Sequence, residues 1–367
     1  MIYKNATLLG GDFRFRTADL EVQDGIITAI GNLGNGTDLH GAYLVPGLID
    51  IHTHGCVGFD HLDGTPEAAA AMCRRYASVG TTSVLATIMT QSEDAMLRAS
   101  ENVCRCQKTA PGAHLRGIYY EGPFFSDTYR GAQHPKYLRE VSPEFVRRLQ
   151  EASGGLARIM SLAPEKANAC ELIAQTDLRI FCGHTDADYA AARAAYDAGA
   201  VGLTHTFNAM RPLHHREPGI LTAAWETPSV FCECICDGFH VHPAVVRLLY
   251  RTVGRERFAV ISDSIRPAGL PDGVYDSAGQ AVTVKNGEAR LADGTVAGSM
   301  TCLLDEVRNL TAWGICELAD AVYAASAVPA KAAGIFDRVG SLEVGKSADL
   351  LILDENLHLL DVQLGKL

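Results

Sequence analysis

Short apolar runs alternate with amphipathic, alanine-rich stretches through the middle of the chain. Stretches such as PEAAAAMCRRYASVG and ADYAAARAAYDAG have the spacing of helices that bury one face. The stretch HPAVVRLLYRTVG predicts a helix that has Pro243 in its first turn and ends at Gly254. Eight runs rich in apolar and β-branched residues predict buried strands, at residues 48–52, 82–87, 115–121, 158–163, 178–184, 200–205, 230–236 and 258–263.

This alternation predicts the fold class. Strands that alternate with helices pair in parallel, and eight such units indicate an α/β protein with a closed (β/α)8 TIM-type barrel. An open, doubly wound sheet is the alternative. No glycine-rich phosphate-binding sequence follows the first strand to favour it.

The two ends of the chain have a different, strand-like pattern. Near the N-terminus, EVQDGIITAIG places an Asp-Gly turn between two apolar runs. Near the C-terminus, GSLEVGKSADLLILDENLHLL is also strand-like. We expect these segments to pair into a small β-sandwich-like domain of residues 1–42 and 340–367, which flanks a barrel domain of residues 43–339.

Composition and charge narrow the function classes. The chain has 367 residues, of which 47% are hydrophobic and 20% charged, as in ordinary globular proteins. Its net charge of −11 argues against a nucleic-acid or membrane partner. The N-terminus has no signal-peptide pattern, and no apolar run reaches the roughly 18 residues of a membrane span. We therefore expect a cytoplasmic protein.

The eleven cysteines are expected to be thiols, because their number is odd and no secretory signal precedes them. Cys232, Cys234 and Cys236 alternate along an apolar run and so share one face of a strand. A thiolate metal site is one interpretation. Three small buried hydrophobic side chains are the interpretation that we favour.

Chemically active side chains follow the predicted strands. In a (β/α)8 barrel the active site lies at the carboxyl ends of the strands. The first strand runs into HTHG, where His52 and His54 point to one side and could hold a metal ion, although exposed loop histidines would give the same pattern. Helix caps would favour Ser, Thr, Asn and Asp rather than histidines. The later strand ends carry Glu121, His184, His205, Asp237, His240 and Asp263.

These residue types suit metal-assisted hydrolysis. Imidazoles and a carboxylate are ligands for Zn²⁺ or Fe²⁺. Glu121, His184 and His205 would form a site with an open position for water. His52 and His54 could hold a second ion, with Glu121 bridging. A metal lowers the pKa of bound water to about 7 and polarises a carbonyl group. Asp263 would accept the proton of the water and pass it to a leaving group.

At these residues the sequence resembles the amidohydrolase superfamily, which has an H-x-H after the first strand and an Asp after the eighth. Within it the chain is similar to the N-acetylglucosamine-6-phosphate deacetylase family. Superfamily members with a bridging carboxylated lysine, such as dihydroorotase, fit less well, because Glu121 stands where a bridging group is needed. The similarity extends from VPGLIDIHTHG through EGPF, LAPE, GHTDA, THTFNAM, REPG, DGFHV, SDS and AGSMTCLLDEVRNL to GKSADL.

The resemblance implies a metal-dependent hydrolase of amino-sugar metabolism that removes acetate from N-acetylglucosamine 6-phosphate and holds one or two divalent ions, Zn or Fe, per chain. It implies a homodimer in which Arg216, in HHREPG, reaches the phosphate in the neighbouring subunit's site. A surface ion pair with Glu217 is the alternative for Arg216. The implied metal ligands are Glu121, His184, His205, His52 and His54, the acid/base is Asp263, and the remaining substrate-binding residues are Ala132, Gln133, Asn208, Ala209, His240, Val296, Ala297, Gly298 and Ser299.

Two points stay open at this level. Many members of the family read Gly-Ala-His where this chain reads Gly131-Ala132-Gln133 before His134, so either Gln133 or His134 could help to polarise the acetyl carbonyl. The substrate alternatives are N-acetylgalactosamine 6-phosphate, which differs at the C4 hydroxyl, and a phosphosugar bound without reaction. A non-catalytic barrel is expected to have lost Asp263 or a metal ligand, and none is missing.

Overall fold

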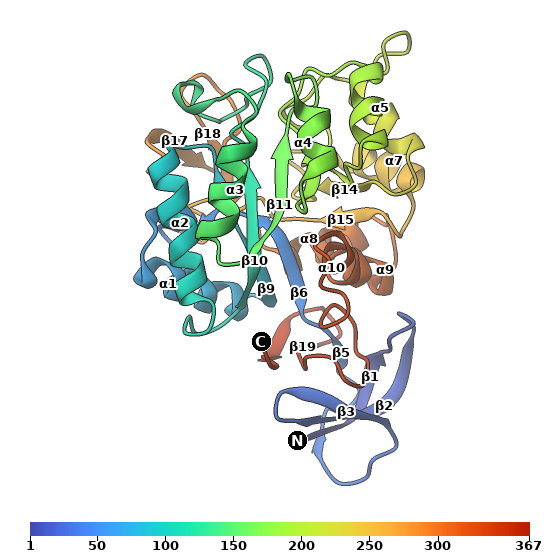
Figure 1. Cartoon of the computed structure of the whole chain (residues 1–367). Helices are drawn as coiled ribbons and strands as arrows, with labels where there is room; N and C mark the ends of the chain where they lie inside the picture. Colours follow the sequence, from blue (N-terminus) through green and yellow to red (C-terminus); the bar gives the residue numbers. More distant parts are fainter.

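Eight parallel strands form the barrel, and each lies within or overlaps one of the predicted apolar runs (Figure 1). The computed structural model describes all 367 residues. The strands pair in the order β15-β14-β13-β12-β11-β10-β9-β6. Because both faces are buried, most strands carry apolar residues on both faces instead of alternating with polar ones. The strands are β6 (Leu48–Thr53), β9 (Thr81–Met89), β10 (His114–Glu121), β11 (Ala157–Leu162), β12 (Arg179–Cys182), β13 (Gly202–Leu203), β14 (Phe231–Cys234) and β15 (Phe258–Val260).

Helices cover the outside of the barrel. Thr65 caps α1 by accepting a hydrogen bond from the Ala68 amide, and α7 begins at Pro243 and ends against Gly254, as the sequence predicts. The helices are α1 (Pro66–Ser78), α2 (Glu93–Cys106), α3 (Pro143–Ala152), α4 (Ala169–Gln175), α5 (Tyr189–Asp197), α6 (Gly219–Glu226), α7 (Pro243–Val253), α8 (Leu303–Ala312), α9 (Leu318–Ala324) and α10 (Ala327–Ala332), with the short 3-10 turns η1 (His61–Asp63) and η2 (Pro135–Tyr137). None of these helices has the length and hydrophobicity required to cross a membrane.

One hydrophobic cluster fills the inside of the barrel, and a second lies between the barrel strands and the surrounding helices. Inward-facing residues such as Ile51, Tyr119 and Phe181 form the inner cluster, and Ala330 of α10 and Val339 belong to the same cluster. The outer cluster lies between strands and helices. Cys232, Cys234 and Cys236 are fully buried in that outer cluster and belong to no group of potential metal ligands, as the favoured interpretation requires.

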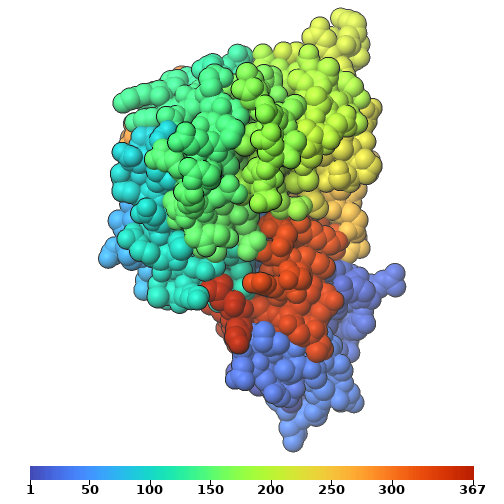
Figure 2. All heavy atoms as spheres, in the orientation of Figure 1, coloured from blue at the N-terminus to red at the C-terminus, as the bar shows by residue number.

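A small mixed sheet contains both ends of the chain and has a hydrophobic core of its own. Its strand order is β20-β19-β5-β1-β2-β3, with β4 paired to β1. Figure 2 shows the N-terminal and C-terminal segments packed together below the barrel. The predicted pairing of the two ends is confirmed, and the boundaries at residues 42 and 340 stay a prediction. The strands are β1 (Ile2–Leu9), β2 (Phe15–Gln23), β3 (Ile26–Gly31), β4 (Thr37–Asp38), β5 (Tyr43–Pro46), β19 (Leu350–Leu353) and β20 (Leu359–Gln363).

Two connections matter for the site. The strand β5 of the small sheet leads through Gly47 directly into β6 of the barrel. A three-stranded antiparallel sheet, β16 (Gly273–Ser277), β17 (Gln280–Lys285) and β18 (Glu288–Arg290), is inserted after β15. Its Gln280 amide donates to the Ala132 carbonyl at 2.7 Å, which ties the inserted sheet to the loop after β10. A short ribbon of β7 (Gly55–Cys56) and β8 (Phe59–Asp60) follows β6.

A buried arginine joins the barrel to the C-terminal segment. Arg116 of β10 is 6% exposed, and its Nη2 donates to Asp349 Oδ2 at 2.9 Å. Its Nε donates to the hydroxyl of Ser83 on β9 at 3.2 Å. A buried carboxylate that loses its cationic partner is costly, so this contact stabilises the association of the two parts.

We therefore expect Arg116→Ala to lower the free energy of unfolding by about 3–5 kcal/mol, because the buried Asp349 carboxylate loses its arginine partner and keeps only the hydrogen bonds from Ser347 and Gly365. Urea denaturation followed by circular dichroism measures the change. Arg147→Ala is the control, since Arg147 pairs with Glu151 one helical turn away and both side chains are more than half exposed. The control should change stability by less than about 1 kcal/mol. Equal stabilities of the two variants would contradict the role of Arg116.

Candidate active site

Glu121 lies at the centre of the site, at the carboxyl end of β10, and is 2% exposed. Its Oε1 is 3.0 Å from His184 Nε2 and 3.1 Å from His205 Nε2. The same oxygen is 3.4 Å from His52 Nε2, and Oε2 is 3.3 Å from His54 Nε2. The structure thus brings the four predicted ligand histidines together around the fifth predicted ligand, the Glu121 carboxylate.

These residues fit a pair of divalent cations. Their donor atoms form two groups, Glu121 with His184 and His205, and Glu121 with His52 and His54, and within each group the atoms lie within 4.8 Å of one another. The Nε2 atoms of His184 and His205 approach to 3.0 Å beside one carboxylate oxygen, as ligands around a common ion do. His52 Nε2 is buried and has no hydrogen-bond partner, which is unfavourable unless it binds an ion. The two groups indicate a two-metal site that shares Glu121.

Buried contacts fix the directions of the histidine rings. His184 Nδ1 donates to the Tyr129 carbonyl at 3.2 Å, and the ring of His184 packs on Phe125. His52 Nδ1 donates to Glu233 Oε2 at 3.0 Å. Hydrogen bonds of this kind to the second ring nitrogen hold the other nitrogen toward a metal.

The backbone is strained where the chain leaves the strands for the site. His184, His205 and Asp263 have φ angles of 47°, 25° and 47°. Non-glycine residues in this region cost of order 1–3 kcal/mol each and occur mainly at functional sites. This conformation also explains why β12, β13 and β15 end before the predicted runs do, since these residues turn out of the strands to face the site.

Asp263 lies beside the second ligand group. Its Oδ1 is 3.2 Å from His54 Nε2 and 3.6 Å from His52 Nε2. Burial disfavours the charged form, but the hydrogen bond between Asp263 and His54 outweighs burial and lowers the pKa of Asp263. The side chain is therefore a carboxylate, ready to accept a proton.

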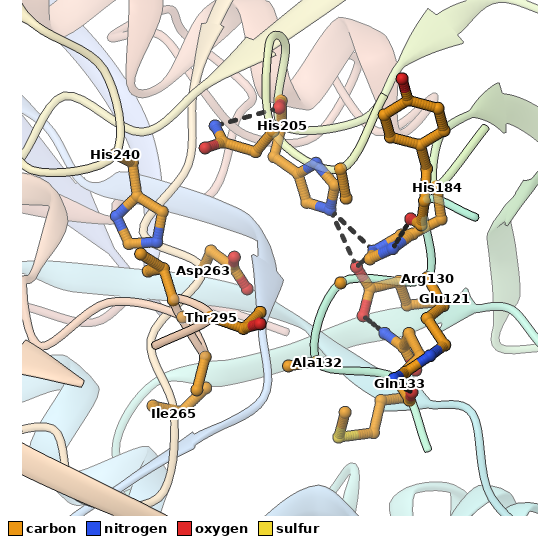
Figure 3. A pocket seen from close by; sticks show the side chains of 18 of the residues that line it. Glu121, Arg130, Ala132, Gln133, His184, His205, His240, Asp263, Ile265 and Thr295 are labelled. Carbon is orange, nitrogen blue, oxygen red and sulfur yellow. Dashed lines mark hydrogen bonds and ion pairs between the residues drawn. The ribbon is translucent and has the colours of Figure 1, made fainter. Parts of the chain in front are cut away.

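A cavity of about 480 Å³ opens above these groups, a size typical of small-molecule sites (Figure 3). His240 lies on the same side as Asp263, opposite Glu121. The predicted substrate residues that line the cavity are Ala132, Gln133, Asn208, Ala209, His240, Val296, Ala297 and Gly298.

Two predicted residues lie elsewhere. The hydroxyl of Ser299 donates to the Ser262 carbonyl, and the Ser299 amide donates to the Asp263 carbonyl at 2.8 Å, so Ser299 supports the Asp263 strand end instead of lining the cavity. Arg216 is exposed, and its guanidinium group contacts His215 rather than Glu217. Arg216 lines no part of the cavity of its own chain.

The side chains of Gln133 and His134 lie in different places, and only that of Gln133 contacts a predicted metal ligand. Gln133 is 2% exposed, its Oε1 accepts from the Thr90 amide at 3.1 Å, and its Nε2 donates to Glu121 Oε2 at 2.6 Å. His134 instead caps the turn η2, with its Nδ1 accepting from the Lys136 amide, and its ring packs on Tyr137. Gln133 is therefore the one that faces the reaction centre.

His240 is held by Asp237, whose Oδ2 accepts from His240 Nδ1 at 2.6 Å. Burial opposes protonation of the ring, but the hydrogen bond and charge of Asp237 outweigh it and raise the pKa of His240. Asp237 thus fixes the ring of His240, whose Nε2 is left to form a hydrogen bond with a ligand in the cavity.

Sequence reasoning missed several residues. Thr90, which orients Gln133, gave no signal in the sequence. Glu233 could have been noticed in the sequence, because an acidic residue within a buried parallel strand is rare unless another polar group pairs with its carboxylate. The lining also contains segment 127–131 and Thr295, which lie in loops without a recognisable pattern.

Known proteins show the same fold and sequence pattern. Residues 43–364 match the model of the amidohydrolase family. The N-acetylglucosamine-6-phosphate deacetylase of Bacillus subtilis is 40% identical over 86% of this chain and 82% of its own length. The N-acetylgalactosamine-6-phosphate deacetylase of Escherichia coli O157:H7 is 37% identical over 92% of this chain and 91% of its own length.

A solved structure is similar over nearly the whole chain. A mutant of the N-acetyl-D-glucosamine-6-phosphate deacetylase of Mycobacterium smegmatis, in complex with N-acetyl-D-glucosamine-6-phosphate, superposes with a TM-score of 0.94 at 33% identity. The match covers 99% of this chain and 97% of the other. With its barrel, its shared carboxylate and its strand-end histidines, the chain belongs to the amidohydrolase family.

Proposed function

We propose that the protein is a two-metal deacetylase that hydrolyses N-acetylglucosamine 6-phosphate to glucosamine 6-phosphate and acetate. One observation carries the proposal: four buried histidines converge on Glu121 beside Asp263, next to a cavity of the size of a small metabolite. Relatives with this activity are 33–40% identical over most of their length.

The metal ions and the side chains have different tasks in the reaction. Divalent ions of the Zn²⁺ or Fe²⁺ type, when bound by Glu121 and the histidines, supply Lewis acidity and a lowered pKa of water. Asp263 accepts one proton of the attacking water as its oxygen bonds to the acetyl carbon. Asp263 then gives that proton to the sugar nitrogen as the carbon–nitrogen bond breaks, which leaves acetate and a free amine.

Other residues bind and orient the substrate. Thr90 holds the Gln133 amide toward the site, and the second N–H of that amide is free to donate to the acetyl oxygen. His240, fixed by Asp237, forms a hydrogen bond with a sugar hydroxyl. Residues 296–298, Asn208 and Ala209 form further parts of the cavity wall.

The phosphate requires a cation. Because the chain carries a net charge of −11, long-range attraction does not draw in an anionic substrate, and local contacts must hold it. Arg216 is exposed and lies outside its own cavity. We propose a homodimer in which Arg216 of one chain completes the phosphate site of the other, as a guanidinium fork suits phosphate oxygens.

N-acetylgalactosamine 6-phosphate is the second candidate substrate, because a deacetylase of that name from E. coli O157:H7 is 37% identical to this chain. The two sugars differ only in the orientation of the C4 hydroxyl. We expect faster acetate release from the glucosamine derivative, and the reverse order would favour the second candidate.

The experiment that tests the function measures acetate release from both phosphosugars by metal-loaded wild type and by Asp263→Asn. We expect the variant to lose at least about 10²-fold in turnover, the scale of general acid–base catalysis, since an amide cannot accept the proton. Circular dichroism and metal content, which should match the wild type, are the controls. Absence of acetate release by the wild type would refute the function, and near-normal turnover of the variant would remove Asp263 from the mechanism.

Metal analysis tests the two-ion centre. Metal-loaded wild type should contain close to two ions per chain, because each ligand group holds one. The double variant His52→Ala/His54→Ala should retain about one, since Glu121, His184 and His205 stay in place. Loss of all metal would show a single shared site, and an unchanged content would show that His52 and His54 are not ligands.

Mixing variants tests the role of Arg216. Arg216→Ala should raise KM for the phosphosugar by about 10- to 150-fold, the equivalent of a lost charge-assisted hydrogen bond of roughly 1.5–3 kcal/mol. Mixed dimers of Arg216→Ala and Asp263→Asn chains should regain activity at low substrate, because one of their two sites has both groups intact. Hybrid dimers no more active than their parents would show that Arg216 does not act across an interface.

A further inference from the structure

Glu233 is a fully buried acidic residue inside the barrel. It lies in β14 between Cys232 and Cys234, whose side chains point outward into the cluster between strands and helices. Because successive side chains of a strand point to opposite faces, Glu233 points into the barrel, below the cavity. Its side chain does not line that cavity.

One oxygen of Glu233 contacts both metal-ligand groups. Its Oε2 accepts from His52 Nδ1 at 3.0 Å and from the backbone amide of His205, also at 3.0 Å. His52 belongs to one group and His205 to the other. The carboxylate therefore connects the two halves of the proposed two-ion centre from beneath.

We propose that Glu233 is a positioning residue that sets the affinity of this chain for its second metal ion, acting through the His52 ring. The inference rests on the two-ion centre of the proposed function. Since a carboxylate only accepts, His52 Nδ1 must carry the proton, and Nε2 keeps its lone pair beside Glu121. Tyr119 packs on the same ring, with centroids 4.7 Å apart, and limits its rotation.

The negative charge of Glu233 serves this role better than a neutral acceptor would. A carboxylate bonded to a ligand histidine makes that histidine a stronger ligand. The charge is expensive in a core that has no lysine or arginine beside it, and the second oxygen, Oε1, has no hydrogen-bond partner. A glutamine would supply the same hydrogen-bond acceptor without that cost. Neighbouring cations at the two-ion centre are what make a carboxylate favourable at this position.

The chain offers a matched control. Glu306 of α8 is equally buried and likewise accepts from a backbone amide, that of Cys236, at 3.0 Å. Glu306 also has one unpartnered oxygen, but it contacts no metal ligand. Burial raises the pKa of Glu306 well above its usual range, so Glu306→Gln controls for the loss of a buried carboxyl group that accepts from a backbone amide. Only Glu233→Gln lies next to the metal ligands.

The test is a Zn²⁺ titration of metal-free wild type, Glu233→Gln and Glu306→Gln against a chelator of known affinity. We expect Glu233→Gln to bind the weaker of two ions about 10- to 100-fold less tightly than the wild type does, the usual effect of losing such a partner. Glu306→Gln should match the wild type. The unfolding temperatures of the metal-free proteins are a further control. We do not expect them to follow the order of the Zn²⁺ affinities, so they separate a loss of ligand positioning from a general loss of stability.

Equal Zn²⁺ affinities in Glu233→Gln and Glu306→Gln would overturn the inference, and so would a wild type that binds one ion. If Glu233→Gln does not fold, Glu233→Asp replaces it. Glu233→Asp keeps the charge and should bind two ions with a weakened second site, and an unweakened second site would overturn the inference. Acetate release by the same wild-type preparation tests the function separately, because an active enzyme with unchanged affinity in Glu233→Gln refutes only the role of Glu233.

Discussion

The organisation of the site depends on one carboxylate that is shared between two sets of histidines. Glu121 is buried at the centre of the barrel mouth, and each of its oxygens faces imidazole nitrogens from strands that are far apart in the sequence. A buried carboxylate is tolerated only when cations or strong donors surround it. Around Glu121 those partners are four histidines and the Gln133 amide. The barrel fold places these five side chains around the Glu121 carboxylate.

Much of this arrangement could be predicted from the sequence, because residues at the carboxyl ends of the strands of a parallel barrel lie close together. Each apolar run that ends in a polar residue delivers that residue to the same rim, so His52, Glu121 and Asp263 meet although the chain separates them widely. The family resemblance added the roles of Asn208 and the loop at 296–298. The pairing of the two chain ends followed from their strand-like patterns.

Other features of the site depend on tertiary contacts that the local sequence does not predict. The positive φ angles of His184, His205 and Asp263 arise because surrounding structure forces the chain to turn, whereas local preference disfavours them. The choice between Gln133 and His134 is a matter of one residue of register, decided by the Thr90 amide in a different loop. Ser299 was predicted as a substrate-binding residue from the family resemblance, yet its hydroxyl turns back to the Ser262 carbonyl.

The small sheet has a consequence for how the enzyme is made. Its strand β5 continues into β6, which carries His52, and β5 pairs on one side with β19 from the far end of the chain. During synthesis on the ribosome, domains fold as they emerge, N-terminal parts first. Here the strand that leads to the first ligand histidine lacks one of its neighbours until β19 has been translated. The small sheet can therefore complete its pairing only after β19 has been synthesised, later than every strand of the barrel.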